Sequence, residues 1–322
     1  MDNKRRLDGI NDLKIFTGNA NPDLAKKICE HLSIKLGDAY VGRFPDGEID
    51  IKVNEDVRGS DVFLVQPTCA PVNENLVELL IFIDCLRRAS ASRITAVLPY
   101  YGYARKDRKD EGRVPITAKL AANIITEAGA DRVLTVDLHA AQIQGFFDIP
   151  VDHLLAFPVI SKYFAAMNTE DLVVVTPDVG GIKLARNYSK KLGIKMAIVD
   201  KRRVGPEETE VGFVIGDVSG KNVVMIDDLI ATGGSIAQAA NVLKERGAKD
   251  IYVGTTHPVF CGAAVQKLAA APIKEIIVTD TIPLGDKVKG LGDKIKVLTI
   301  SGLLGDAIKR IHRHESVSSL FV

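Results

Sequence analysis

The strongest constraint on the fold is a repeated alternation of short Val- and Ile-rich runs with longer segments of helical period. DVFLVQ (61–66) and RITAVLPY (93–100) are typical of buried strands, and VNENLVELLIFIDCLRRA (72–89) between them has helical spacing. This order predicts an α/β fold, with mainly parallel sheets flanked by helices. It recurs in ITAKLAANIITEAGA with RVLTVDLH, in LVVVTPD with GIKLARNYSKKLG and KMAIVD, and in VVMIDD with SIAQAANVLKERGA and IYVGTTHP.

Glycines separate the helical segments from the strands that follow them. Gly129, Gly193 and Gly247 each stand where a helical pattern stops, so we expect left-handed cap residues there. Two of these junctions, at 127–139 and 245–258, resemble each other, and both of their strands lead into a His-bearing loop. A duplicated domain would explain this resemblance, although an ordinary α/β pattern also produces some of it by chance.

The composition of the chain limits the classes of function that it can have. A chain of 322 residues with 46% hydrophobic residues can fill two cores, and 42 Lys and Arg against 41 Asp and Glu give no basic footprint for nucleic acid. The N-terminus lacks an apolar segment for export, and no apolar run is long enough to cross a membrane, so the cytoplasm is the expected compartment. The cysteines lie in apolar stretches, which favours buried structural thiols: Cys29, Cys69, Cys85 and Cys261.

Ligands of open parallel sheets gather at the carboxyl ends of the strands. Loops that follow predicted strands are therefore the places to search for chemistry. They are Pro99 to Arg113, Asp137 to Gly145, Pro177 to Gly181, Asp200 to Glu210 and Asp227 to Ser235.

One of these loops, within VVMIDDLIATGGS (223–235), combines carboxylates with a glycine-rich turn. The N–H groups of Thr232 to Ser235 can converge on an anion at a helix N-terminus, although an ordinary strand-to-helix turn would read the same. The nucleotide P-loop and the Rossmann glycine pattern are both absent from the sequence. Asp227 and Asp228 suit a sugar phosphate, because they can accept hydrogen bonds from ribose hydroxyls while the loop holds the phosphate.

This stretch resembles the phosphoribosyl diphosphate (PRPP) binding motif of phosphoribosyltransferases and ribose-phosphate diphosphokinases. With six further segments the chain is similar to the diphosphokinases over nearly its whole length. The segments are RFPDGEIDIKV, LPYYGYARKDRK, DLHAAQIQGFFDIPVDHL, TPDVGG, VDKRR and ESVSSLF. The resemblance implies two tandem phosphoribosyltransferase-like domains, at 1–150 completed by a C-terminal helix at 301–322, and at 151–300 with the PRPP motif.

The resemblance also implies an activity: transfer of the diphosphoryl group of MgATP to the 1-hydroxyl of ribose 5-phosphate, giving PRPP and AMP. It assigns the transfer to Lys201 and Arg203, and Mg²⁺ to His139 and Asp178. ATP is assigned to Phe44, Asp46, Glu48, Arg105 and Lys106, and ribose 5-phosphate to Asp227, Asp228, Thr232, Gly233, Gly234 and Ser235. A hexamer and regulation by phosphate and ADP, through serines such as Ser316 and Ser318, are implied as well.

The residues alone leave simpler readings open. RFPDGE is also typical of a hairpin turn, and YYGYARKDRKDEGR of a solvated charged loop. In DKRRVGPEETEVG, Gly205, Pro206 and the acidic run predict a long mobile loop after a strand, although an ordinary solvated loop has the same pattern. His153 and His257 are interpreted as structural.

Two positions depart from the family pattern: Lys106, where many relatives have Gln, and Ala231, where an acid is usual. Rival functions are a phosphoribosyltransferase, a non-catalytic paralogue, and a binding module without turnover. The length of the chain and the segment at 99–113 disfavour the first, and the presence of Lys201, Arg203 and His139 disfavours the others.

Overall fold

The computed structural model describes residues 13–167, 171–203 and 209–321, without the side chains at positions 179, 200–203, 209–212 and 321. These residues form two compact units. The first comprises Met1–Leu155, Thr281–Pro283 and Thr299–Val322, and the second Ala156–Asp280 and Leu284–Leu298. Whether each unit folds as a separate domain with the predicted boundaries stays a prediction.

The first unit is built on a parallel sheet of five strands in the order β1-β4-β5-β6-β7, beside a two-stranded antiparallel hairpin, β2-β3. Its strands are β1 (Leu13–Thr17), β2 (Ala39–Arg43), β3 (Ile49–Val53), β4 (Asp61–Val65), β5 (Arg93–Leu98), β6 (Arg132–Val136) and β7 (Val151–Leu154). Its helices are α1 (Pro22–Leu32), α2 (Val72–Arg88), α3 (Thr117–Ala128) and α8 (Ser301–His312), with 3₁₀ turns η2 (Ala141–Phe146) and η5 (Ser318–Phe321).

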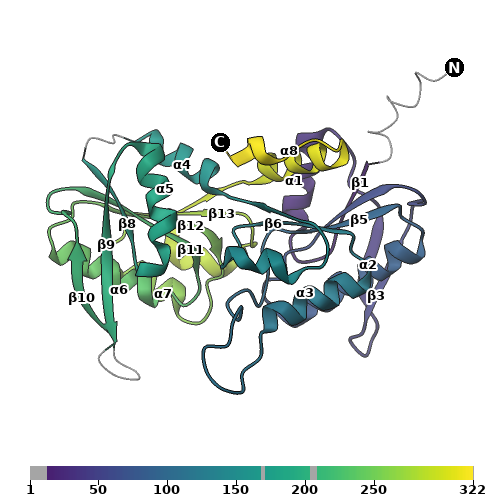
Figure 1. Ribbon diagram of the computed structural model, residues 1–322, viewed down its shortest axis with the longest axis horizontal. Coiled ribbons are helices and arrows are strands. Elements are labelled where there is room, and N and C mark those ends of the chain that lie inside the picture. Colours follow the sequence, from purple (N-terminus) through teal and green to yellow (C-terminus); the bar gives the residue numbers. More distant parts are fainter. Residues whose placement is uncertain (1–12, 168–170, 204–208, 322) are drawn as a thin grey trace. The chain divides into compact units, whose positions relative to one another are not determined.

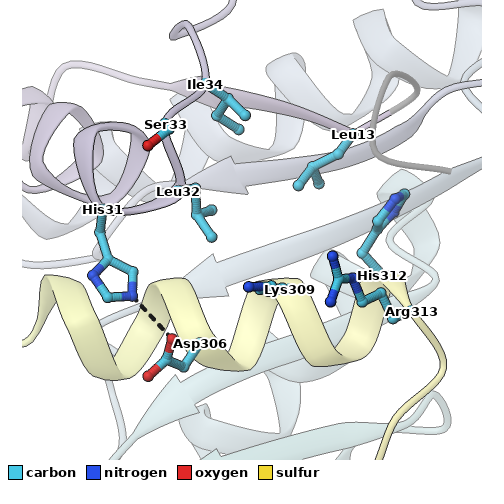
Figure 2. Close-up of a pocket in the computed structure, with 9 residues that line it drawn as sticks. All are labelled: Leu13, His31, Leu32, Ser33, Ile34, Asp306, Lys309, His312 and Arg313. Atoms are coloured by element: carbon cyan, nitrogen blue, oxygen red, sulfur yellow. Dashed lines mark hydrogen bonds and ion pairs between the residues drawn. The ribbon is translucent and has the colours of Figure 1, made fainter. Parts of the chain in front are cut away.

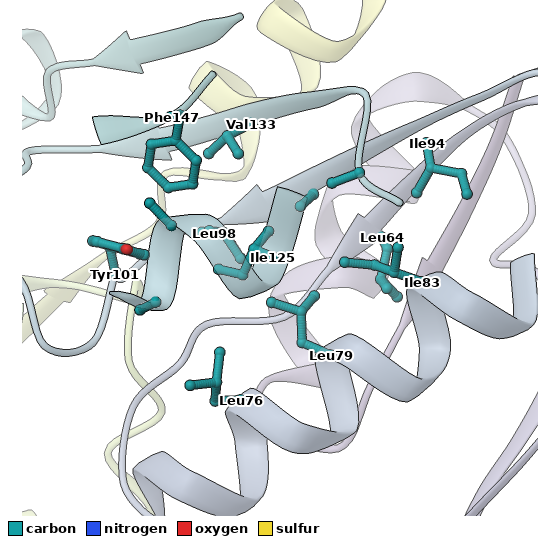
Figure 3. Close-up of a cluster of buried hydrophobic side chains, with 14 of the residues drawn as sticks. Leu64, Leu76, Leu79, Ile83, Ile94, Leu98, Tyr101, Ile125, Val133 and Phe147 are labelled. Atoms are coloured by element: carbon teal, nitrogen blue, oxygen red, sulfur yellow. The ribbon is translucent and has the colours of Figure 1, made fainter. Parts of the chain in front are cut away.

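Helices cover both faces of this sheet. On one face α2 and α3 pack side by side over an apolar cluster that includes Leu64, Leu79, Ile94 and Ile125 (Figures 1 and 3). The apolar residues of α2 recur three or four positions apart, which places them on the stripe that faces the sheet. On the other face α8, in yellow, lies against α1, in purple (Figure 1).

The second unit is built on a seven-stranded sheet in the order β10-β9-β8-β11-β12-β13-β14, parallel except for β10. Its strands are β8 (Leu172–Thr176), β9 (Lys195–Arg203), β10 (Thr209–Ile215), β11 (Asn222–Ile230), β12 (Ile251–Pro258), β13 (Glu275–Thr279) and β14 (Ile295–Leu298). Its helices are α4 (Phe157–Ala165), α5 (Ile182–Leu192), α6 (Gly234–Glu245) and α7 (Ala264–Ala270), with 3₁₀ turns η3 (Val179–Gly181) and η4 (Gly285–Lys294).

Successive residues of its central strands face opposite layers of helix. Met225 and Val253 pack in one cluster with the apolar residues of α6 and α7. On the other face, a side chain at Gly254 would meet Phe164 and Ile160 of α4. The sheet is therefore covered on both sides, as its continuous apolar strands require.

The structure confirms the predicted alternation and the positive-φ glycines, whose φ angles are 117° at Gly129, 66° at Gly193 and 84° at Gly247. The prediction of a long loop over 200–210 is wrong at both ends. β9 continues to Arg203, and β10 begins at Thr209 and pairs with it, because the antiparallel ladder satisfies the backbone of a segment whose polar side chains suggested a loop.

The prediction of buried cysteines holds for Cys29 and Cys69 but is wrong for Cys261, which is exposed, and only partly right for Cys85, which is half-buried. Cys261 follows β12 instead of lying in it, so the apolar run beside it does not enclose its thiol. Within the described ranges, every helix is too short or too polar to cross a bilayer.

Candidate active site

The glycine-rich turn of the second unit connects β11 to α6. Gly233 is the N-cap residue of α6 in the left-handed region, with a φ of 70°, and a glycine has no side chain that could accept a hydrogen bond from the first turn of the helix. Thr232 and Ser235 are exposed beside it. The N–H groups at this helix start are therefore left for an anion, as the sequence predicts.

Carboxylates stand next to this loop. β11 runs on to Ile230, so Asp227 and Asp228 lie within the strand, beyond the last residue that pairs with β8. Burial raises the pKa of Asp227 well above its usual value, and the charges of Asp228 and Asp178 raise it further. Asp227 is thus close enough to Asp228 and to Asp178 for both charges to act on it, which favours a cation or hydroxyl donors beside it.

The loop that carries Asp178 is held by its own hydrogen bonds. The Thr176 hydroxyl donates to the carbonyl of Asp178 at 2.7 Å, and the N–H of Gly181 donates to Asp178 Oδ1 at 3.2 Å. Asp178 is exposed at the end of β8, the neighbour of β11. The order of parallel strands therefore brings together carboxylates that lie about fifty residues apart in the chain.

This donor set fits Mg²⁺ only in an open form. In the described part of the chain, no group of three or more His, Cys, Asp or Glu side chains is arranged to hold a metal ion. Mg²⁺ in phosphate-transfer sites commonly uses one or two carboxylates and completes its shell with water and substrate phosphates. Asp178 and Asp227, whose charges lie close enough to interact, suit an arrangement with one or two carboxylates.

The predicted adenine residues of the first unit lie at the tip of the β2-β3 hairpin. The N–H of Phe44 donates to the carbonyl of Glu48 at 2.8 Å, and the N–H of Gly47, whose φ is 95°, donates to the carbonyl of Phe44 at 2.9 Å. Asp46 Oδ1 accepts from the N–H of Glu48 at 3.1 Å. The simple hairpin reading is confirmed, and the tip leaves the Phe44 ring 49% exposed.

The predicted polyphosphate contacts lie in the segment between β5 and α3. Lys106 Nζ is 3.3 Å from Asp110, and the carbonyl of Lys106 accepts from the N–H of Ala118 at 3.1 Å, which ties the loop to the start of α3. Gln142 Nε2 donates to Asp107 Oδ2 at 2.9 Å from η2. Arg105 is exposed and forms no ion pair with a described residue. Both predicted cations thus stand on an anchored loop.

His139 lies exposed just after β6 in the first unit. Its loop is fixed by His153, whose Nε2 accepts a hydrogen bond from the N–H of Leu138 at 2.9 Å. This contact supports a structural role for His153, and His257 is 2% exposed. His139 and Asp178 belong to different units, so their shared metal role stays a prediction.

Lys201 and Arg203 belong to β9, and their backbones pair with those of Val211 and Thr209 of β10, respectively. Their side chains lie outside the described atoms. Ser316 and Ser318 are exposed after α8: the carbonyl of Ser316 accepts from Arg310, and its hydroxyl accepts from the N–H of Ser318. The predicted roles of these four residues stay predictions.

No sequence pattern predicted how closely α7 approaches the glycine-rich turn. A Cβ at Gly233 would lie 3.2 Å from the carbonyl oxygen of Ala264 and from Leu268 Cγ, and one at Gly234 would lie 3.8 Å from Lys267 Nζ. The only signal in the sequence is that small residues, Gly233 and Ala264, occur where two helices meet.

A separate cavity of about 250 Å³ lies in the first unit between α1 and α8 (Figure 2). Figure 2 shows His31 directed at Asp306, with 2.9 Å between Nε2 and Oδ1, and the basic Lys309 and Arg313 further along α8. The cavity is lined by none of the predicted site residues.

Comparison with known proteins identifies the family. Residues 13–129 match the N-terminal domain of ribose phosphate pyrophosphokinase, and residues 199–322 the phosphoribosyl synthetase-associated domain. The chain is 58% identical over 316 residues to a ribose-phosphate pyrophosphokinase of Rhodopirellula baltica, covering 97% of this chain and 99% of the relative. The chain belongs to the ribose-phosphate pyrophosphokinase family.

Two further comparisons lead to the same family. The family enzyme of Caldanaerobacter subterraneus is 55% identical over 312 residues, which cover 97% of this chain and 98% of that protein. The crystal structure of phosphoribosylpyrophosphate synthetase from Mycobacterium smegmatis superposes with a TM-score of 0.88 at 42% identity, covering 94% and 99% of the two chains. The resemblance and the α/β fold class are confirmed, and the reaction known for this family forms PRPP from ribose 5-phosphate and ATP.

Proposed function

We propose that this chain carries out the reaction of its family with ribose 5-phosphate bound at the carboxyl edge of the second sheet. The 1-hydroxyl oxygen of the sugar attacks the β-phosphorus of ATP. A new P–O bond forms, the bond from that phosphorus to the oxygen shared with the α-phosphate breaks, and AMP leaves with that oxygen. The hydroxyl proton is released, and no covalent bond to the enzyme is needed.

The observation that carries the proposal is the pairing of an uncapped helix start with three neighbouring carboxylates. The N–H groups of Thr232 to Ser235 would hold the 5-phosphate at the positive end of α6. Asp227 and Asp228 would accept hydrogen bonds from the ribose hydroxyls, and the charge of Asp228 already acts on Asp227 strongly enough to raise its pKa. The 1-hydroxyl is thereby oriented.

ATP would bind through the two exposed features of the first unit. Phe44, with Asp46 and Glu48 beside it, offers an exposed ring for the adenine at the hairpin tip. Arg105 and Lys106 offer two cations for the triphosphate. The exposure of an aromatic ring and of an arginine without a described carboxylate partner supports these roles.

Asp178 and His139 would hold Mg²⁺ together with oxygens of the substrates. Bound there, Mg²⁺ would neutralise the phosphate charge that opposes attack. Asp178 lies close enough to Asp227 to raise its pKa, so an added cation would relieve repulsion that the protein itself creates.

Lys201 and Arg203 would stabilise the diphosphoryl group during transfer. Phosphoryl transfer needs alignment and charge neutralisation more than covalent chemistry, and both residues can supply positive charge without a proton transfer. Loss of one such contact typically costs about two to three powers of ten in rate.

We also propose that the protein works as a cytoplasmic homohexamer under control by phosphate and ADP. Two aromatic residues of the hairpin are about half exposed, Tyr40 with 51% and Phe44 with 49% of its surface accessible. Their exposure supports a contact with another copy of the chain or with a ligand. Sedimentation with and without phosphate tests the assembly. A fully active monomer would contradict it.

The function is tested by incubating the protein with ATP, Mg²⁺ and ribose 5-phosphate. AMP and PRPP should form in equal amounts, and neither should form when the sugar phosphate is omitted. If neither product forms over a range of phosphate concentrations, the proposed function fails.

A further inference from the structure

Lys267 is placed beside the glycine-rich turn by the packing of its own short helix. The chain leaves β12 and runs along the end of β11: the N–H of Phe260 donates to the carbonyl of Ile230 at 3.0 Å, and the N–H of Cys261 donates to the carbonyl of Ala231 at 2.9 Å. These two backbone bonds fix where α7 begins relative to the turn.

α7 then packs directly on the turn. Ala264 and Leu268, one helical turn apart, approach Gly233 so closely that a Cβ there would lie 3.2 Å from each of them. Lys267 is adjacent to Leu268 and three residues after Ala264, so it lies at the border of the packed face. Its Nζ reaches to 3.8 Å from the position of a Cβ on Gly234, the first residue of α6.

The charge at this position needs an explanation. The start of α6 carries partial positive charge, and a cation placed there is repelled by it. Within the described residues, no carboxylate forms an ion pair with Lys267. An anion bound at the helix start would be attracted by both the ammonium group and the N–H groups, and it would turn this repulsion into a joint contact.

We propose that Lys267 is a further substrate-binding residue that contacts the 5-phosphate of ribose 5-phosphate. The inference rests on the proposed function for the identity of the ligand. Lys267 would sit on the α7 side of the phosphate, and the N–H groups of Thr232 to Ser235 would approach it from the turn. Because the contact is to the phosphate and not to the reacting hydroxyl, it should contribute mainly to the affinity for the sugar phosphate.

The test compares Lys267→Met with Lys267→Arg and with Lys296→Met. Lys296 is an exposed lysine of β14 in the same unit, so its replacement removes the same charge away from the turn. Calorimetric binding of ribose 5-phosphate to the full chain is measured at several salt concentrations. Lys267→Met should raise the Kd about tenfold or more and flatten its salt dependence, because one charge-assisted contact is lost.

Lys267→Arg should keep most of the affinity, and Lys296→Met should bind like the unmodified protein. In turnover, Lys267→Met should raise the KM for ribose 5-phosphate and leave the KM for ATP unchanged. Binding of ribose 5-phosphate to Lys267→Met within twofold of the unmodified protein overturns the inference, as does a failure of the unmodified protein to bind it. If the unmodified protein binds the sugar phosphate and Lys267 matters, but no PRPP forms, the proposed function fails and the inference stands.

Discussion

Asp61, the first residue of β4, accepts a hydrogen bond of 2.8 Å from Nδ1 of His312, the last residue of α8, across 251 positions of sequence. Arg93 of β5 also donates to Asp61, through Nε at 2.8 Å, and to the carbonyl of Ile311 at 3.2 Å. All three side chains are largely buried. The C-terminal helix is thus tied to the central strands of the first sheet.

Replacing Asp61 by Asn should lower the free energy of unfolding by about 2 kcal/mol at pH 7, since it removes a charge that two partly buried donors require. The control is Asp306→Asn, which removes the exposed pair with His31 and should cost about 0.5 kcal/mol or less. Urea unfolding of both variants measures the difference. Equal effects would contradict a special role for Asp61.

The contact between Asp61 and His312 also predicts how the free energy of unfolding changes at acid pH. Burial tends to raise the pKa of Asp61, but the hydrogen bonds and charges of His312 and Arg93 outweigh it and hold the pKa below 3.8. A carboxyl with a lowered folded-state pKa stabilises the fold above its ordinary pKa, and that contribution is lost as the pH falls through the folded value. The stabilities of the unmodified chain and of Asp61→Asn should therefore converge below about pH 4, which unfolding curves at stepwise lower pH would show.

Asp227→Asn should separate stability from activity. Because burial and the charges of Asp228 and Asp178 raise the pKa of Asp227, its ionisation weakens the fold as the pH rises above 3.8. Without substrate, the variant should melt higher than the unmodified chain at pH 8, by about 2–4 °C for each kcal/mol in a unit of this size, and show no gain at pH 3. Its rate of PRPP formation should fall about a hundredfold. A variant that melts lower at pH 8 would show that Asp227 is stabilised by its neighbours instead of repelled.

Replacing Gly233 by Ala should lower the stability of the fold, whereas replacing Gly234 by Ala should weaken the binding of ribose 5-phosphate. At Gly233 the φ of 70° and the 3.2 Å approach of Ala264 and Leu268 should cost about 1–3 kcal/mol of stability. At Gly234 the φ is ordinary and the nearest atom is the flexible Lys267 Nζ at 3.8 Å, so the fold should tolerate the methyl group. That methyl group would lie beside Lys267 Nζ, the proposed phosphate contact, so calorimetry should show weaker binding of ribose 5-phosphate at nearly unchanged melting temperature.

Ala231→Asp tests the departure from the family pattern. The carbonyl of Ala231 accepts from Cys261, and this backbone contact does not depend on the side chain. A carboxylate there would add an acceptor for a ribose hydroxyl, so the KM for ribose 5-phosphate should fall about tenfold, the size of one hydrogen bond to a charged group. An unchanged KM would show that Asp227 and Asp228 are sufficient.

Local pattern predicted much of the fold, but not the contacts that join distant segments. The helical period of α2 and the left-handed cap at Gly129 follow from neighbouring residues, so both could be predicted. The pairing of β10 with β9 could not, because the polar side chains of 200–210 are also typical of a loop. The bond between Asp61 and His312 depends on how α8 returns to the first sheet, which no short stretch encodes.

The residues of the candidate site likewise include some that a local sequence pattern predicts and others that only the packing of distant segments brings together. The turn at Thr232 to Ser235 and its acids were found because they form one short motif next to a strand. Lys267 was missed, since an exposed lysine on a short helix has no distinctive pattern, and only the packing of Ala264 on Gly233 brings it to the turn. The roles of Lys201 and Arg203 rest on family membership, and the structure adds only their place on β9.

The most direct test follows the β-phosphorus of ATP. With ATP labelled at that atom, Mg²⁺ and ribose 5-phosphate, the label should appear in PRPP at the rate at which unlabelled AMP appears. Label recovered instead in ADP or in free phosphate or diphosphate would mean transfer of a single phosphoryl group or hydrolysis. Either result would contradict diphosphoryl transfer to the 1-hydroxyl of the sugar.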